Sequence, residues 1–137
     1  MIGIVLIGHA HIASQMKEVL QHILGEQPLI ATLDITDENN AETLSSQLQM
    51  KIRACNVGSG VLLLADMFGG TPCNIAMGCL QKGQVEVVSG FNLPLLIKAA
   101  SMRDKVDSVA DLATLVVTAG RQYICMASDF QAAQTHV

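Results

Sequence analysis

Residues 61–74, around which the rest of the chain is organised, read VLLLADMFGGTPCN. The first five are apolar and uncharged, which predicts a short strand buried on both faces of a sheet. Asp66 follows, then two glycines and Thr71-Pro72, a pair typical of a helix start. Because backbone N–H groups point outward at a helix start and glycine permits close approach, Gly69, Gly70 and Thr71 are predicted to bind phosphate. Taken alone, the two glycines are more typical of a simple turn than of a binding site.

A second apolar run, residues 2–7, predicts another buried strand that delivers His9 into the loop before the next helix. If the two strands are parallel neighbours, their carboxyl ends lie side by side. His9 and Asp66 then converge at the crevice where doubly wound sheets bind ligands. A neutral imidazole can attack a phosphoryl group through one nitrogen while the other donates a hydrogen bond to a carboxylate. The pair therefore predicts catalysis rather than a purely structural contact.

The remaining pattern alternates strands with helices and predicts one α/β domain over all 137 residues. We expect a doubly wound, mainly parallel sheet of four strands in the order 2-1-3-4, flanked by helices. The further strands are predicted at 29–35 and 85–88, and the helices at 12–24, 41–54, 72–82, 93–100 and 108–120. Residues 123–126 fit either a helical turn or a short extra strand, and the last ~8 residues should form a flexible tail.

Composition excludes several classes of protein. A formal net charge of −4 with 3% aromatic residues argues against nucleic-acid binding. No apolar run approaches the ~20 residues needed to cross a bilayer, and the N-terminus lacks a basic leader, so we expect a cytoplasmic protein without membrane insertion. The four cysteines show no metal-ligand spacing and are expected to be reduced and buried. No metal or cofactor is predicted.

The chain resembles, over nearly its whole length, the enzyme IIA components of the mannose-type (mannose/fructose/sorbose) sugar phosphotransferase system. Three segments carry the resemblance, and the second and third are specific when they occur together at this separation: GHAHIA at 8–13, DMFGGTPCN at 66–74 and SGFNLPLL at 89–96. The family usually has Ser or Thr before its histidine and Gly after it, whereas this chain has Gly8 and Ala10.

The resemblance implies a phosphotransferase that works through a phosphohistidine. His9 would accept a phosphoryl group from the small carrier protein HPr and pass it to a IIB partner in carbohydrate uptake, with Asp66 orienting the ring. Phe68 and Asn92 would lie at the edge of the site, and His11 is a nearby competitor that fits the pattern less well. The resemblance also implies a homodimer in which an antiparallel C-terminal strand is exchanged between subunits.

Three alternatives remain open from the sequence. The same phosphorylation of His9 could serve as a regulatory signal without sugar transport. The phosphocarrier of dihydroxyacetone kinase also has an N-terminal active histidine, although residues 66–74 favour the mannose type. A small-ligand module that binds a nucleotide or a flavin would suit the fold class, and its affinity should be unaffected by substitution of His9.

Overall fold

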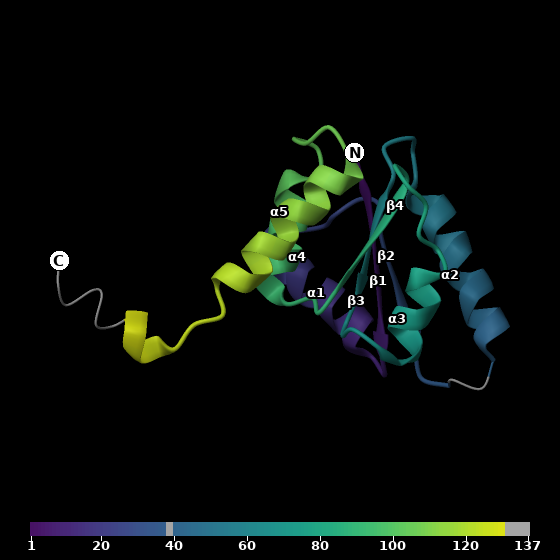
Figure 1. The fold of residues 1–137 in the computed structure, drawn as a ribbon, viewed down its shortest axis with the longest axis horizontal. Coiled ribbons are helices and arrows are strands. Elements are labelled where there is room, and N and C mark those ends of the chain that lie inside the picture. The colour runs from purple at the N-terminus through teal and green to yellow at the C-terminus, as the bar shows by residue number, and fades with distance from the viewer. Residues whose placement is uncertain (38–39, 131–137) are drawn as a thin grey trace.

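A four-stranded parallel sheet with helices on both faces forms the body of the protein (Figure 1). The computed structural model describes residues 1–37 and 40–130. The strands lie in the order β2-β1-β3-β4, as predicted, and every neighbouring pair is parallel. In chain order the elements are β1 (Gly3–His9), α1 (Ile12–Leu24), β2 (Ile30–Ile35), α2 (Ala41–Cys55), β3 (Val61–Ala65), α3 (Gly70–Met77), β4 (Val85–Ser89), α4 (Leu93–Met102) and α5 (Val109–Gln122).

The two central strands, β1 and β3, are apolar along their length because both of their faces are covered. Successive side chains point to opposite faces of the sheet, so Ile4 and Leu62 enter one core while Val5 and Leu63 enter the other. The first core is closed by α1, α4 and α5, and the second by α2 and α3. Ile7 of β1 is paired with Ala65 of β3, so both strands end at the same edge of the sheet. His9 and Asp66 therefore lie at that edge.

Strand β1 extends two residues beyond the predicted run and includes His9 itself. The extension is held by β2, because His9 pairs with Ile35 in the ladder and the Ala10 N–H donates to the Ile35 carbonyl at 2.9 Å. His9 is therefore the last residue of a strand rather than a loop residue.

Helix α3 also differs from expectation, since it starts two residues earlier than predicted and ends at Met77 rather than near residue 82. Its end has a backbone cause. Gln81 and Val85 exchange two backbone hydrogen bonds, of 3.1 and 2.8 Å, and this bridge closes a tight turn that a continuing helix would prevent.

The chain beyond α5 leaves the body of the molecule (Figure 1). Residues 124–126 have no regular secondary structure, so neither a strand nor a helical turn forms there within the single chain. Cys125 is exposed and Cys79 only partly buried, unlike the prediction for all four thiols, although all four are free. Residue 130 is still helical, and most of the predicted flexible tail lies outside the described residues, at 131–137.

Candidate functional site

His9 and Asp66 meet at the carboxyl edge of the sheet because β1 and β3 are neighbours in register. The Asp66 Oδ2 atom accepts the backbone N–H of His9 at 2.9 Å and lies 2.7 Å from the His9 Nδ1 atom. The other carboxylate oxygen, Oδ1, accepts the N–H of Met67 at 3.0 Å. One carboxylate thus fixes both the backbone and the ring of His9.

The electrostatics of the pair favour an ionised Asp66 carboxylate. Burial raises the pKa of Asp66, but hydrogen bonds from the His9 backbone and ring, with the charge of the ring, outweigh burial and hold that pKa below its ordinary value. An ionised Asp66 can only accept a hydrogen bond, so Nδ1–H is the donor in this pair, and in a neutral ring the lone pair lies on Nε2. The Asp66 side chain is 9% exposed and that of His9 is 41% exposed. The His9 ring is therefore accessible from solvent while the carboxylate that holds it is nearly buried.

The start of α3 lies against the opposite edge of the His9 ring. Gly69 is the N-cap, with φ of 85°, and as a glycine it brings no capping side chain to this helix. Gly70, with φ of 80°, lies so close that a Cβ there would be 3.3 Å from the His9 Cε1 atom and 3.4 Å from Nε2. Thr71 is the second helical residue rather than the cap. The arrangement directs Nε2 toward the positive end of a helix.

Phe68 and Asn92 are the two residues predicted for the edge of the site. Phe68 is 76% exposed and lies in the segment that joins Asp66 to Gly69. The amide of Asn92 caps α4, accepting from the Leu95 N–H at 3.0 Å, and donates to the Gly120 carbonyl at 3.0 Å. Asn92 therefore ties α4 to α5, which is a structural use of its side chain.

His11 belongs to a different cluster from His9. Its Nδ1 atom lies 3.5 Å from the Oδ2 atom of Asp34, and its side chain is 71% exposed. Asp34 also accepts from Ser14, through the backbone N–H at 3.0 Å and the hydroxyl at 2.5 Å. Sequence reasoning did not single out Asp34 or Ser14. The available signal was a lone carboxylate near the end of β2, the strand beside β1.

Two unusual residues flank His9. A Cβ on Gly8 would collide with the Ile12 Cγ2 atom and lie 3.3 Å from the Asp66 Cβ atom, so the bulky Ile12 side chain leaves room only for glycine. Ala10 has φ of 51°, in the left-handed region where glycine is favoured. The turn that carries His9 is therefore tightly packed on one side and strained on the other.

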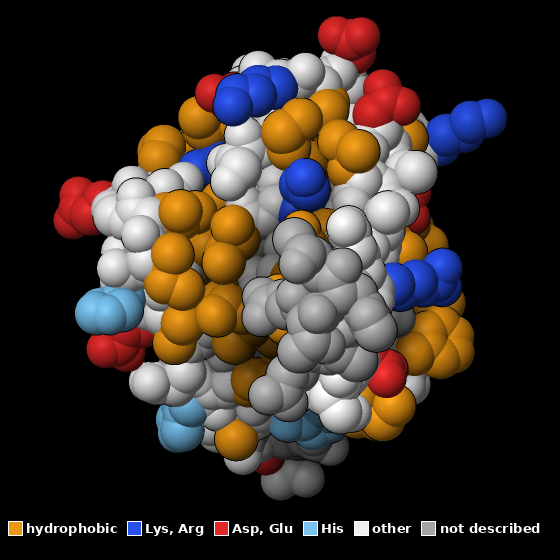
Figure 2. Space-filling view, turned by 90° about the vertical axis from the view of Figure 1, so that its left-hand side faces the viewer, with side chains coloured by type: hydrophobic (Ala, Val, Ile, Leu, Met, Phe, Trp, Pro, Cys, Tyr) orange, Lys and Arg blue, Asp and Glu red, His pale blue; other side chains and the backbone are white. Residues whose placement is uncertain are grey.

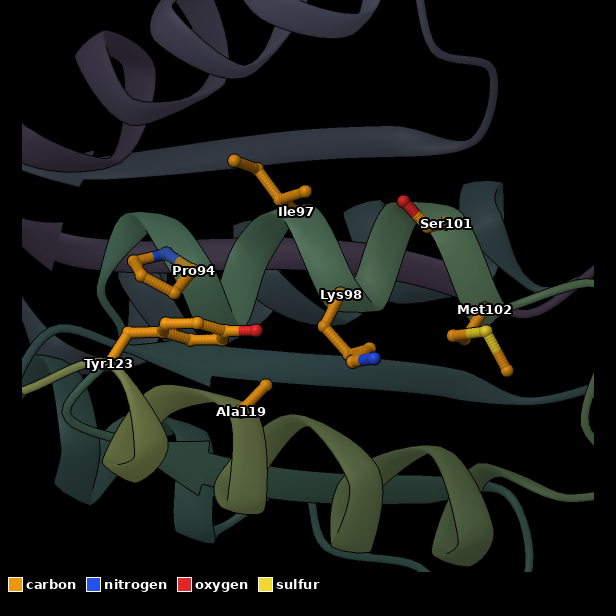
Figure 3. A pocket seen from close by; sticks show the side chains of 7 residues that line it. All are labelled: Pro94, Ile97, Lys98, Ser101, Met102, Ala119 and Tyr123. Atoms are coloured by element: carbon orange, nitrogen blue, oxygen red, sulfur yellow. The ribbon is translucent and has the colours of Figure 1, made fainter. Parts of the chain in front are cut away.

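A separate hollow of about 430 Å³ lies between α4 and α5. Pro94 and Tyr123 stand at one end of this groove and Met102 at the other, with Lys98 between them (Figure 3). Neither His9 nor Asp66 lines it. His9, with a side chain that is 41% exposed, therefore lies on the surface outside this groove.

Fold and site together define a class: a parallel α/β domain that presents an aspartate-held histidine at the carboxyl edge of its sheet. A sequence model of the family described as "PTS system fructose IIA component" matches residues 3–116. The chain therefore belongs to this EIIA-man family. The resemblance seen in the sequence is thus confirmed.

Individual relatives agree with the family assignment. The chain is 34% identical, over 88% of its length, to the PTS system mannose-specific EIIAB component of Escherichia coli, of which it spans 38%. It is 35% identical to the PTS system sorbose-specific EIIA component of Lacticaseibacillus casei, over 71% of this chain and 70% of that protein. The solved structure of phosphotransferase system component EIIA from Streptococcus agalactiae superposes with a TM-score of 0.85 at 25% identity, covering 94% of this chain and 99% of the other.

Within residues 1–37 and 40–130, no three His, Cys, Asp or Glu side chains converge in a way that could hold a metal ion. No helix in that same part of the chain combines the length and the apolar character needed to traverse a bilayer.

Proposed function

We propose that this protein is a phosphohistidine carrier of a sugar phosphotransferase system, with His9 as the phosphorylated nucleophile and Asp66 as the residue that orients it. The observation that carries the proposal is the pairing of Nδ1 with Asp66 at 2.7 Å, on a ring whose Nε2 edge faces the start of α3. Membership of the EIIA-man family supports the same role.

The chemistry of the transfer requires no external reactant beyond the phosphorylated donor. The lone pair on Nε2 attacks the phosphorus of a donor phosphohistidine; the new N–P bond forms as the donor's N–P bond breaks, and the donor imidazole leaves with that electron pair. His9 keeps its proton on Nδ1 throughout, so its ring gains positive charge. Asp66, ionised and 2.7 Å away, stabilises that charge.

The phosphoryl oxygens would be received at the N-terminus of α3. Gly69 and Gly70 supply a backbone without side chains beside the ring, and the helix dipole favours negative charge there by roughly 0.3–1 kcal/mol at an exposed site. Thr71 follows as the next residue of that helix and would contribute its polar groups. Catalysis would therefore rest on position and electrostatics rather than on a metal or cofactor.

The partners in this proposal are proteins: HPr as the donor and a IIB component as the acceptor, both acting with this chain in the cytoplasm. An exposed nucleophile suits transfer between proteins, and large apolar side chains surround it. Ile12 is 41% exposed, Met67 53% and Phe68 76%. Such side chains supply the desolvated centre that transient protein interfaces use.

The test is phosphorylation with purified enzyme I, HPr and phosphoenolpyruvate, followed by intact mass and ³¹P NMR. We expect acid-labile phosphate on the wild type and on His11→Gln, and none on His9→Gln. A wild type that takes no label would refute the proposal and favour the small-ligand alternative. A labelled protein that passes phosphate to no IIB component would leave the regulatory role as the better interpretation.

We further propose that the protein acts as a homodimer joined through its C-terminal segment. Strand β4 is an edge of the sheet, and the segment after α5 exposes Tyr123, Ile124, Met126 and Phe130, each at least 61% exposed. Hydrophobic side chains also gather on the face from which this segment departs (Figure 2). Light scattering at micromolar concentration should give twice the mass of one chain, and truncation after Gln122 should give the monomer. A monomeric full-length chain would refute the exchange.

A further inference from the structure

Two carboxylates, not one, hold the turn that carries His9. Asp66 follows β3 on one side of β1 and accepts the backbone N–H of His9. Asp34 lies in β2 on the other side of β1, beside Gly8 in the ladder, and accepts the backbone N–H of Ser14 in the first turn of α1. The segment between these anchors therefore has its two ends pinned to two different strands.

Asp34 replaces a missing helix cap. His11 is the N-cap residue of α1, yet its side chain makes no capping hydrogen bond. The Asp34 carboxylate does this from another strand, through Oδ1 to the Ser14 N–H at 3.0 Å and through Oδ2 to the Ser14 hydroxyl at 2.5 Å. Since only Ala10 and His11 separate β1 from α1, any shift of this helix start is passed directly to His9.

The Asp34 carboxylate also affects which helix N-terminus can bind the transferred phosphoryl group. Two helices, α1 and α3, begin close to His9 in the chain or in space. The N-terminus of α1 already holds the negative charge of Asp34. That of α3 has a glycine cap and no capping side chain. A phosphoryl group on His9 is thereby directed to α3, because the Asp34 side chain already occupies the Ser14 N–H at the start of α1.

We propose that Asp34 is a positioning residue of the phosphoryl-transfer site: by anchoring Ser14 it fixes the start of α1 and hence the backbone and ring direction of His9. This inference rests on the proposed function of His9 for its kinetic consequences. Its geometric consequences concern the His9 ring alone and do not depend on that function.

The variants separate hydrogen bonding from charge. Asp34→Ala removes both hydrogen bonds between Ser14 and residue 34. Asp34→Asn keeps them, because the amide oxygen can accept the Ser14 N–H and the amide NH₂ can donate to the Ser14 hydroxyl oxygen. The hydroxyl proton then turns to the His11 carbonyl, 3.2 Å away. Ser14→Ala removes the hydroxyl hydrogen bond and keeps the one from the backbone N–H. Glu26 is an exposed acid in the loop after α1, and Glu26→Ala is the control for loss of a negative charge.

Each variant is first checked by circular dichroism and then assayed for phosphoryl transfer from phosphorylated HPr. We expect Asp34→Ala to lower kcat about 10- to 100-fold with little change in KM, since small misplacement of a nucleophile has effects of this size. Ser14→Ala should fall between Asp34→Ala and the wild type, while Asp34→Asn, His11→Gln and Glu26→Ala should stay near the wild type. A folded Asp34→Ala with unchanged kcat, or an Asp34→Asn as impaired as Asp34→Ala, would overturn the proposal.

The ring of His9 is followed separately by ¹⁵N NMR in unphosphorylated protein. The wild type and Asp34→Asn should share one set of His9 ring signals with Nδ1 protonated, and Asp34→Ala should lose or shift them. Unchanged signals in Asp34→Ala would refute the positioning role. If the wild type accepts no phosphate at all, the proposed function fails while this measurement still decides the inference.

Discussion

The two ends of the sheet use buried polar groups in opposite ways. At the carboxyl end, buried Asp66 supports a His9 side chain that is 41% exposed. At the amino end, Arg103 is 1% exposed and donates to the Leu29 carbonyl at 3.3 Å and to the Gln27 side-chain oxygen at 3.2 Å. The first polar cluster includes an exposed side chain, whereas in the second Arg103 is buried and donates its hydrogen bonds within the fold.

This contrast distinguishes His9, the proposed nucleophile, from Arg103, which stabilises the fold. Arg103 ends α4 and holds the loop between α1 and β2, in which Leu29 has a left-handed φ of 53°. Burial lowers the pKa of Arg103, and its Nε atom has no partner among the described residues. Such a group costs free energy to bury, so its hydrogen bonds to the loop matter to the fold. Substitutions at the two ends should therefore give opposite results for activity and stability.

The largest effect on activity is expected for Asp66→Asn. Its single amide oxygen cannot serve both His9 and Met67, and its NH₂ group opposes one of those N–H donors. The rate of phosphoryl transfer should fall by about 10²–10³, as for loss of one stabilising group in an electrostatic site. Rapid-quench kinetics with phosphorylated HPr would measure it. A rate within tenfold of the wild type would show that the carboxylate does not orient the ring.

Arg103→Met should give the reverse pattern. The Leu29 carbonyl and the Gln27 oxygen lose their donor, which should lower the free energy of unfolding by about 1–3 kcal/mol. Urea titration would measure this loss. The transfer rate below the unfolding transition should not change, because Arg103 lies at the far end of the strands. A slower rate in the folded variant would mean that the two ends are coupled.

A pair of glycines sharpens the comparison. Gly70 and Gly83 have φ of 80° and 81°, but only Gly70 has the His9 ring within reach of a Cβ. Alanine at either position should cost about 1–2 kcal/mol of stability through backbone strain. Only Gly70→Ala should also slow the transfer, by about tenfold through displacement of the ring. Equal transfer rates in the two variants would remove Gly70 from the site.

The smallest effect concerns stability in acid. The pKa values of Asp66 and Asp34 lie below the ordinary 3.8, although burial alone would raise them, because hydrogen bonds to His9 and Ser14 favour the ionised forms. A carboxyl whose pKa is lower when folded stabilises above its unfolded pKa and loses that contribution as the pH falls through the folded value. Stability should thus decline below about pH 4. Asp66→Asn and Asp34→Asn should each flatten that decline in urea titrations, and an unchanged slope would show that these two carboxylates do not cause it.

Much of this architecture could be predicted because its signals are local. Apolar runs of strand length gave β1 and β3, and helical spacing of apolar residues gave α1 with both of its bounds. The strand order followed, and neighbouring carboxyl ends then placed His9 beside Asp66. These steps needed only periodicity and the rules of parallel sheets.

The features that were missed depend on tertiary contacts. The end of α3 at Met77 depends on the bridge between Gln81 and Val85. That bridge is a pair of backbone hydrogen bonds, which the sequence around Gly78 does not predict. Asp34 resembles any polar residue of a half-buried strand until Ser14 is seen to lie against it. In the sequence Arg103 resembles an ordinary exposed charge after a helix. Only the folded chain shows that it is buried and donates to the Leu29 carbonyl.

The central place of β1 has a consequence for how the protein is made. β1 leaves the ribosome before both of its neighbours, β2 and β3, and Asp66 follows His9 by 57 residues. At synthesis rates of about 5–20 residues per second, the first strand waits roughly 3–11 s for the aspartate. During that time an apolar segment is exposed without partners, which is the state that chaperones recognise. The hydrogen bonds from His9 to Asp66 can form only once β3 has joined the sheet, so under the proposed function a shorter nascent chain would lack the residue that orients the His9 ring.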